Sequence, residues 1–108
     1  MEKTLKTYEL KELLQLHKFL KRQDTKISIG RIRNYLKLKS DSEARGVCQK
    51  YRMYNYLIDN KTFLVADSNG YWLSSDNQEI SRYCKMLVSR NRNTQAQIEE
   101  ANRILGGQ

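Results

Sequence analysis

The sequence predicts a mainly helical domain that carries one small β-hairpin, and three observations lead to this class. The residues Ser-Asp-Ser-Glu at 40–43 form a capping-box pattern that opens a helix through residue 54. A shorter capped helix, expected over 29–36, comes directly before it. Two apolar runs, 62–66 and 71–74, follow it, and the Asn-Gly pair between them is a strong short-range hairpin pattern.

The elements before the capping box follow from apolar periodicity and from a cap. A first helix is expected over 5–22, because apolar side chains recur there at three- and four-residue spacing. Its predicted stripe contains Leu10, Leu13, Leu14, His17 and Leu20, with the histidine as a packed or edge imidazole. Residues 26–28 suit a short strand, and Ser28 suits the N-cap of the helix at 29–36.

The helix at 41–54 has an apolar face and a basic polar face. At about 100° per residue, the apolar stripe collects Ala44, Val47, Cys48 and Tyr51. The predicted outward face contains Ser42, Arg45, Gly46, Gln49 and Met53, with Lys50 and Arg52 on its flanks. In the capping box, the Ser40 hydroxyl is expected to accept from the Glu43 amide, and the Glu43 carboxylate to accept from the Ser40 amide.

A hairpin is expected to follow, over 62–74, and we call it the wing. The link before it, 56–61, either continues the helix or forms a loop. Because side chains alternate along a strand, Tyr71 and Leu73 are expected to face the core. Trp72 would then cover the other face of the hairpin or meet the last helix.

The last helix is expected to be long, running from 77 to 105. A second capping box at 76–79 opens it, and the glycine pair at 106–107 ends it. Its apolar first half is expected to pack on the winged core, 1–76, so that the 108 residues form a single domain.

Charge and composition narrow the class of function. Lys and Arg number 20 against 12 Asp and Glu, and the formal net charge of +8 favours nucleic acid or another polyanion. No apolar run approaches the ~18 residues of a membrane span, and no signal-peptide pattern is present. The sequence therefore predicts a cytoplasmic protein without a membrane partner.

The chemistry-bearing residues do not indicate an enzyme. No P-loop, G-x-S-x-G or paired-carboxylate motif is present. Cys48 and Cys84 fall among apolar positions of predicted helices and are expected to be small buried hydrophobes. Two cysteines and one histidine without metal-ligand spacing cannot make a zinc site within one chain. We therefore expect no enzymatic activity, no metal and no cofactor.

The outward face of the helix at 41–54 carries residue types that read base edges. Arg45 can bond guanine bidentately and Gln49 can pair with adenine, while Ser42 can reach a base or a phosphate. The same side chains also fit an ordinary solvated helix face. The predicted DNA contacts are Arg31, Arg33, Ser40, Ser42, Arg45, Gly46, Gln49, Lys50, Arg52, Met53, Lys61, Ser68 and Asn69.

These segments resemble small winged helix-turn-helix proteins of bacteria and their phages. That family shares roughly Ser-Asp-Arg-x-x-Arg-x-x-Ile-x-x-Leu-Arg, a short link, a strand and Gly-Tyr-x-Leu, and a similar wing occurs in the biotin repressor's DNA-binding domain. The matching residues are Ser40, Asp41, Arg45, Cys48 in place of Ile, Tyr51 in place of Leu, Arg52, Gly70, Tyr71 and Leu73. The resemblance covers about residues 27–92. Ser42 stands where the pattern often has Arg, and the link 53–61 is long for it.

The resemblance implies sequence-specific binding of double-stranded DNA, by a phage-type transcriptional regulator or a replication-associated accessory protein. A homodimer is expected because one recognition helix reads only a few base pairs. The predicted dimer residues on the last helix are Leu87, Ile98, Ala101 and Leu105. The alternative is a small phage-type protein-binding module that inhibits or recruits a host nucleic-acid machine, since one fold serves many functions.

Overall fold

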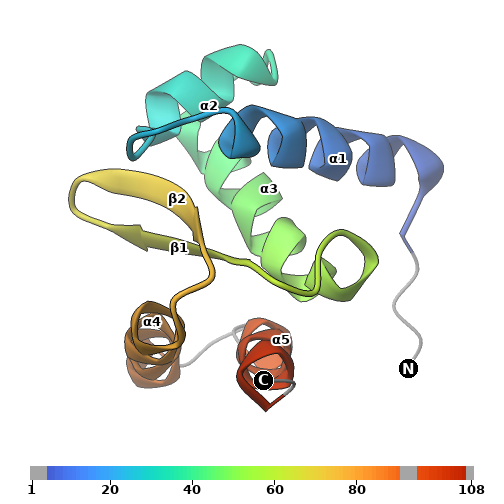
Figure 1. Ribbon diagram of the computed structural model, residues 1–108. Helices are drawn as coiled ribbons and strands as arrows, with labels where there is room; N and C mark the ends of the chain where they lie inside the picture. The colour runs from blue at the N-terminus through green and yellow to red at the C-terminus, as the bar shows by residue number, and fades with distance from the viewer. Residues whose placement is uncertain (1–4, 91–94, 107–108) are drawn as a thin grey trace.

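A computed structural model describes residues 5–90 and 95–106 (Figure 1). The first half contains α1 (Thr7–Lys21), α2 (Ile29–Tyr35), α3 (Asp41–Met53) and the short 3-10 helix η1 (Asn55–Leu57). The second half contains β1 (Phe63–Asp67), β2 (Gly70–Ser74), α4 (Asn77–Arg90) and α5 (Gln95–Gly106). The predicted class, mainly helical with a small antiparallel hairpin, is confirmed. Among the helices described, none is both long and apolar enough to cross a membrane.

The hairpin lies between two helical layers, with α1 to α3 on one side and α4 and α5 on the other (Figure 1). Leu64 and Leu73 form a cross-strand pair that packs with the first layer. Val65 and Trp72 form the next pair, and they pack with the second layer together with Phe63. Alternation along the strands therefore gives the hairpin two buried faces, each with its own apolar cluster.

The turn of the hairpin requires a glycine. Gly70 has φ of 137°, and a Cβ built there would lie 2.8 Å from the carbonyl oxygen of Ile27. This close approach allows Ile27 to pair with Tyr71 through two backbone hydrogen bonds of 2.9 and 2.8 Å. The short strand expected at 26–28 is thus present as a single antiparallel bridge to β2.

Side-chain caps begin the helices of the first layer. The Ser28 hydroxyl accepts from the Arg31 amide at 3.2 Å, as predicted, and begins α2. The Ser40 hydroxyl accepts from the Glu43 amide at 3.1 Å and begins α3. The Glu43 carboxylate accepts from the Lys39 amide at 3.0 Å instead of the predicted Ser40 amide, so the box closes one residue earlier.

The link between α3 and the wing is η1 followed by a loop, so the alternative of a continued helix does not hold. The Asn55 side-chain amide donates to the carbonyl oxygens of Asp59 and Thr62 at 2.8 and 3.0 Å. The Asp59 carboxylate accepts from the Lys61 amide and the Thr62 hydroxyl at 2.8 and 2.9 Å. These bonds fold the chain back toward β1 and satisfy its backbone groups.

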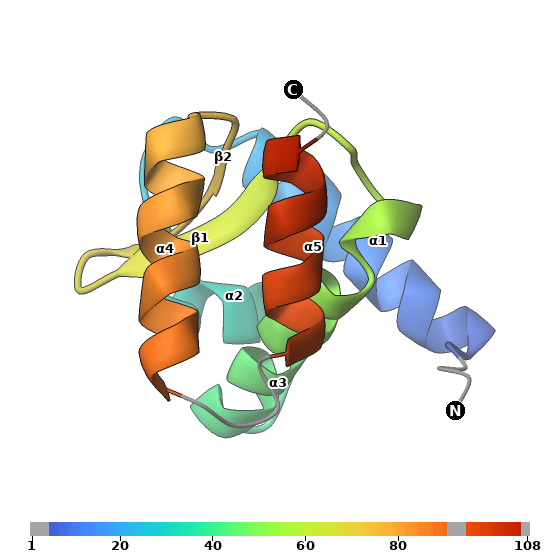
Figure 2. The same ribbon diagram turned by 90° about the horizontal axis from the view of Figure 1, so that it is seen from below.

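The single long helix expected at 77–105 is wrong. The structure has two helices, α4 and α5, that lie side by side under the hairpin (Figure 2), while residues 91–94 fall outside the described residues. Ala101 and Ile104 of α5 pack in one apolar cluster with Ile80 and Leu87 of α4. The two halves of the predicted stripe bury each other, which removes more apolar surface from water than an extended helix would.

The second capping box is also only half formed. The Asp76 carboxylate accepts from the Gln78 amide at 2.8 Å and begins α4. Glu79 instead accepts from the Ser74 hydroxyl at 2.5 Å and from the Trp72 indole at 3.3 Å. Trp72 thus meets the last helical region, one of the two places expected for it, and Glu79 anchors α4 to the wing.

Candidate nucleic-acid interface

The outward face of α3 is open to solvent. Ser42, Arg45, Gly46 and Gln49 are exposed along it, while Ala44, Cys48 and Tyr51 on the opposite face are at most 1% exposed. The apolar stripe therefore fixes which way the polar residues point. The structure brings the four candidate residues together on one surface that spans about two helical turns.

Arg45 and Gly46 form the centre of this face. Within the described residues, Arg45 makes no ion pair and its guanidinium remains available to a ligand. Arg45 lies near enough to the wing to act on Tyr71: burial raises the pKa of that phenol, and the charges of Arg52 and Arg45 oppose the shift. A Cβ at Gly46 would meet nothing within 4 Å, so packing does not explain this glycine.

The prediction that Arg52 contacts DNA is wrong, because its side chain is buried. It is only 4% exposed, and its Nε donates to the Leu64 carbonyl oxygen at 2.6 Å. One terminal nitrogen donates to Gln97 of α5 at 3.3 Å, and the guanidinium lies 4.8 Å from the centre of the Tyr83 ring. Arg52 therefore joins α3 to β1, α4 and α5.

Two other flanking residues are less available than the sequence predicted. Lys50 is half-buried and forms an ion pair with Glu9 of α1. Met53 is half-buried against the apolar cluster of the first layer. Both lie at the α5 end of α3, so the accessible part of the face is the part nearer the N-terminus of α3.

A groove separates this end of α3 from α5. Its volume is about 620 Å³, and it is lined by Gly46, Gln49, Lys50, Met53, Gln95, Ala96 and Glu99. Because Glu99 brings a carboxylate to one wall, the groove is less favourable to a phosphate than the Arg45 end of the helix.

The predicted contacts before α3 divide into free and engaged groups. Arg31 is exposed and forms no ion pair within the described part of the chain. Arg33 pairs with Asp41 at 2.9 Å, and the Ser40 hydroxyl is engaged as the cap of α3. Arg31 is thus the better placed of the two arginines for a phosphate.

The tip of the wing is exposed at Ser68 and Asn69, and Lys61 is exposed at its base. The Asp67 carboxylate accepts from the Asn69 amide at 2.7 Å and pairs with Lys26 at 2.5 Å. The hydrogen bond from Lys26 is the main cause that lowers the pKa of Asp67. The Asp67 carboxylate therefore stabilises the turn, and Lys26 offsets its charge.

The residues predicted for a dimer interface are engaged within one chain. Leu87 is 2% exposed and Ala101 is fully buried, while Ile98 and Leu105 are half-buried against the same cluster. The stripe predicted to hold the dimer interface is instead the contact between α4 and α5. The homodimer itself stays a prediction, now without these four residues to support it.

A half-buried polar contact at the junction of α1, α3 and the η1 loop involves His17, which the sequence predicted as a packed or edge imidazole but without these partners. The His17 ring donates to or accepts from the Tyr51 hydroxyl at 2.6 Å, and its other nitrogen lies 3.9 Å from Asp59. Burial is the main cause that lowers the pKa of His17. Its place on the apolar stripe of α1 was the available signal, although its partners are distant in sequence.

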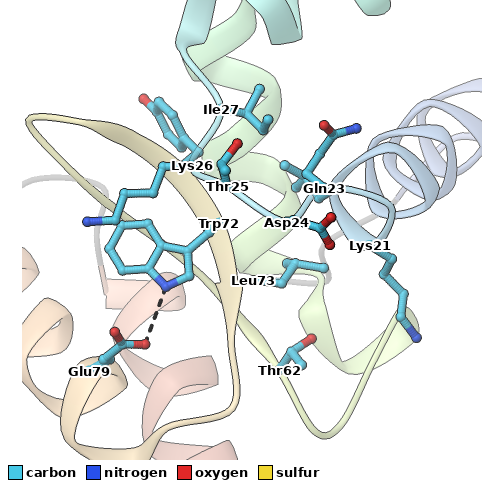
Figure 3. Close-up of a pocket in the computed structure, with 12 residues that line it drawn as sticks. Lys21, Gln23, Asp24, Thr25, Lys26, Ile27, Thr62, Trp72, Leu73 and Glu79 are labelled. Carbon is cyan, nitrogen blue, oxygen red and sulfur yellow. Dashed lines mark hydrogen bonds between the residues drawn. The ribbon is translucent and has the colours of Figure 1, made fainter.

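A hollow lies between the end of α1 and β2 (Figure 3). It has a volume of about 540 Å³, with Trp72 and Leu73 among its walls and Asp24, Lys26 and Glu79 at its polar side. Lys26 lies 4.3 Å from the centre of the indole ring and Glu79 accepts its N–H, so these charges are engaged with the wing.

The cysteines and the other potential metal ligands form no metal site in the described chain. Cys48 and Cys84 are buried and unbonded to each other, and burial raises the pKa of the Cys48 thiol to about 11. Across the described residues, no three His, Cys, Asp or Glu side chains gather closely enough to hold a metal ion.

Comparisons with protein-family models, curated proteins and solved structures found no significant match.

Proposed function

We propose that the protein binds double-stranded DNA through the outward face of α3. The observation that carries the proposal is that Ser42, Arg45 and Gln49 are exposed together on a capped helix whose other face is buried. Arginine and glutamine are the residue types that bond guanine and adenine edges. The net charge of +8 supports a polyanionic ligand.

The order of elements supports a winged helix-turn-helix mode of docking. α2 and α3 are joined by a short turn, the hairpin follows α3, and Ile27 adds a bridge at the edge of β2. In helix-turn-helix proteins the second helix enters the major groove. Arg31, Lys61 and the wing tip at Ser68 and Asn69 are then assigned to the phosphate backbone or the minor groove.

The position of α5 limits which residues of α3 are assigned to base contacts. Since the groove and Glu99 flank the C-terminal half of α3, base readout is assigned to Ser42, Arg45 and Gln49. Such a protein would act as a regulator of transcription or as a replication accessory, and a dimer would lengthen the site that is read.

A second candidate function is a protein-binding module, as proposed from the sequence for a host nucleic-acid machine. The groove between α3 and α5 supports it, as do Tyr56 and Leu57, which are 48% and 49% exposed beside the end of α3. Exposed aromatic and aliphatic side chains are typical of protein interfaces.

Fluorescence anisotropy with a labelled duplex tests the first function. The variant Arg45→Glu with Gln49→Glu is compared with Gln78→Glu with Lys85→Glu, whose positions are exposed on α4. Each pair lowers the net charge by three, so the non-specific effect of charge is matched. We expect the α3 pair to weaken binding by about tenfold and to remove any preference selected from a random library.

The control pair is expected to stay within about threefold of the unchanged protein. Equal losses in both pairs would contradict a specific α3 contact. Absence of duplex binding by the unchanged protein at about 50 mM salt would contradict DNA binding altogether. Capture of a purified nucleic-acid enzyme through the α3–α5 groove would then favour the second candidate.

A further inference from the structure

The outer side of α1 carries a row of cations that the proposed α3 interface does not use. Lys11, Lys18 and Arg22 lie at i, i+7 and i+11, which places them within about 40° of each other around the helix. All three are exposed, and Leu14, which is 40% exposed, lies between them. We call Lys11, Lys18 and Arg22 the α1 stripe.

No carboxylate pairs with the α1 stripe in the part of the chain that the structure describes. Glu9 lies on the inner side of α1, where it binds Lys50. Lys21 is adjacent but is not part of the stripe, because at i+10 from Lys11 it lies about 80° away around the helix. The cations of the stripe therefore make no ion pair within the described chain.

The α1 stripe and the α3 face lie on the solvent sides of two different helices. α1 turns Leu13, Leu16 and Leu20 inward, and α3 turns Ala44 and Tyr51 into the same apolar cluster. Each helix therefore exposes the side that faces away from this cluster. A ligand on one face therefore leaves the other face free.

We propose that the α1 stripe is a second, sequence-independent phosphate-binding surface, so that one molecule bridges two DNA duplex segments. The stripe spans about 16 Å at a rise of 1.5 Å per residue. A duplex carries one charge per ~1.7 Å of its axis, so a segment of this length presents several phosphates to three cations. The bridging part of this inference rests on the proposed α3 function, whereas the phosphate-binding part does not.

The same cations would also attract an anionic membrane, but the structure favours nucleic acid. A helix that lies in a membrane interface needs a broad apolar face to insert. The apolar face of α1 is the buried one, and Tyr8 and Leu14 are the large apolar side chains of α1 that are exposed in the described chain. The outward side of α1 is therefore mainly charged.

A bridging experiment tests the inference. A biotinylated duplex on beads is incubated with protein and a second, fluorescent duplex, and the retained fluorescence is measured at about 50 mM salt. The stripe variant is Lys11→Gln with Lys18→Glu, the α3 variant is Arg45→Glu with Gln49→Glu, and the control is Gln78→Glu with Lys85→Glu. All three lower the net charge by three. Circular dichroism checks that each is folded, and Lys11→Gln with Lys18→Gln replaces the stripe variant if it is not.

We expect the unchanged protein and the control to bridge, and the stripe and α3 variants each to lose about tenfold of the bridging signal. Each of those two variants is still expected to bind one duplex in anisotropy, and their combination is expected to bind none. Bridging that survives in the stripe variant would overturn the inference, because two α3 faces of a dimer would then explain it.

The two proposals fail in different ways. If the α3 variant loses all duplex binding, the stripe is not a phosphate-binding surface while the α3 proposal stands. If only the stripe variant loses duplex binding, the α3 proposal fails and the stripe stands as the sole duplex surface. Co-sedimentation of the unchanged protein with phosphatidylserine-containing vesicles, without bridging of DNA, would assign the stripe to a membrane and overturn the inference.

Discussion

Arg52 holds the two helical layers together from the inside of the domain. Its guanidinium donates to Leu64 on β1 and to Gln97 on α5, and it lies over the ring of Tyr83 on α4. A helical projection places Arg52 at the edge of the polar face of α3, where an arginine is normally solvated. Its burial follows from α5, which folds back over that edge. The sequence could not predict this position because it depends on the packing of α5 against α3 and α4.

The glycines at 46 and 70 are expected to respond in opposite ways to alanine. Gly46→Ala should raise the free energy of unfolding by about 0.5–1 kcal/mol, because helix propensity improves and the site is open. Gly70→Ala should lower it by about 1–3 kcal/mol, because φ is 137° and the Cβ would meet the Ile27 carbonyl. Urea unfolding measures both. Weaker duplex binding by Gly46→Ala would indicate close approach of DNA to the helix backbone, whereas a loss of stability at position 46 would contradict this account of the site.

His17 is expected to make stability fall in mild acid. Burial is the main cause that lowers its pKa below the ordinary value of 6.5, Asp59 opposes the shift and Lys21 adds to it. Since the neutral ring is favoured in the fold, this contribution is full above pH 6.5 and is lost as the pH falls from there toward the lowered pKa. The urea midpoint should therefore drop between pH 7.5 and 5.5. His17→Gln should remove most of that drop, and an unchanged slope in this variant would assign it to other groups.

At the scale of elements, the parts that could be predicted are those fixed by local chemistry. The caps at Ser28 and Ser40 and the Asn69-Gly70 turn each satisfy backbone groups within a few residues, so the sequence contains their cause. The break between α4 and α5 has no such local cause among the described residues. The helical periodicity continues through it, and the choice between one helix and two depends on whether the apolar stripe packs on itself.

The packing of α5 on α4 is expected to contribute strongly to folding. Ala101→Glu should destabilise the protein by more than about 3 kcal/mol, because it places a charge in the fully buried contact with α4. Asn102→Glu changes the next residue, which is exposed and accepts only a 3.8 Å hydrogen bond from the Cys84 thiol, and should have an effect of about 1 kcal/mol or less. Thermal unfolding compares the two. Similar melting temperatures would mean that α5 is not docked in solution.

At the scale of the whole molecule, the net charge indicates the class of ligand, and the fold determines which cations are free to bind it. The charge of +8 predicted a polyanionic partner, but it did not predict where the free cations lie. Ion pairs engage Lys26, Arg33, Lys50 and Arg103, and burial removes Arg52. Fewer of the predicted DNA-contacting residues are therefore free to bind a ligand than the sequence indicated. The Lys26–Asp67 and Lys50–Glu9 pairs each join residues 41 positions apart in the chain, so pattern analysis could not find them.

Duplex binding through α3 and the wing is expected to depend steeply on salt. If Arg31, Arg45 and Lys61 neutralise about three phosphates, the affinity should fall roughly 40-fold between 50 and 200 mM salt. Lys61→Gln should reduce the slope by about 0.9 without changing sequence preference. Anisotropy titrations at four salt concentrations give both values. A salt-independent affinity would be incompatible with phosphate contacts.

The two-stranded hairpin also bears on aggregation. Exposed strand edges are templates on which other chains can add, and proteins avoid this by occupying them. Here Ile27 pairs with Tyr71 along β2, and the Arg52 guanidinium takes the Leu64 carbonyl on β1. The same arginine that joins the layers therefore also shields a strand edge. A variant that lacks it would expose that edge in an apolar segment, and its concentration limit in solution would be set by strand addition between molecules.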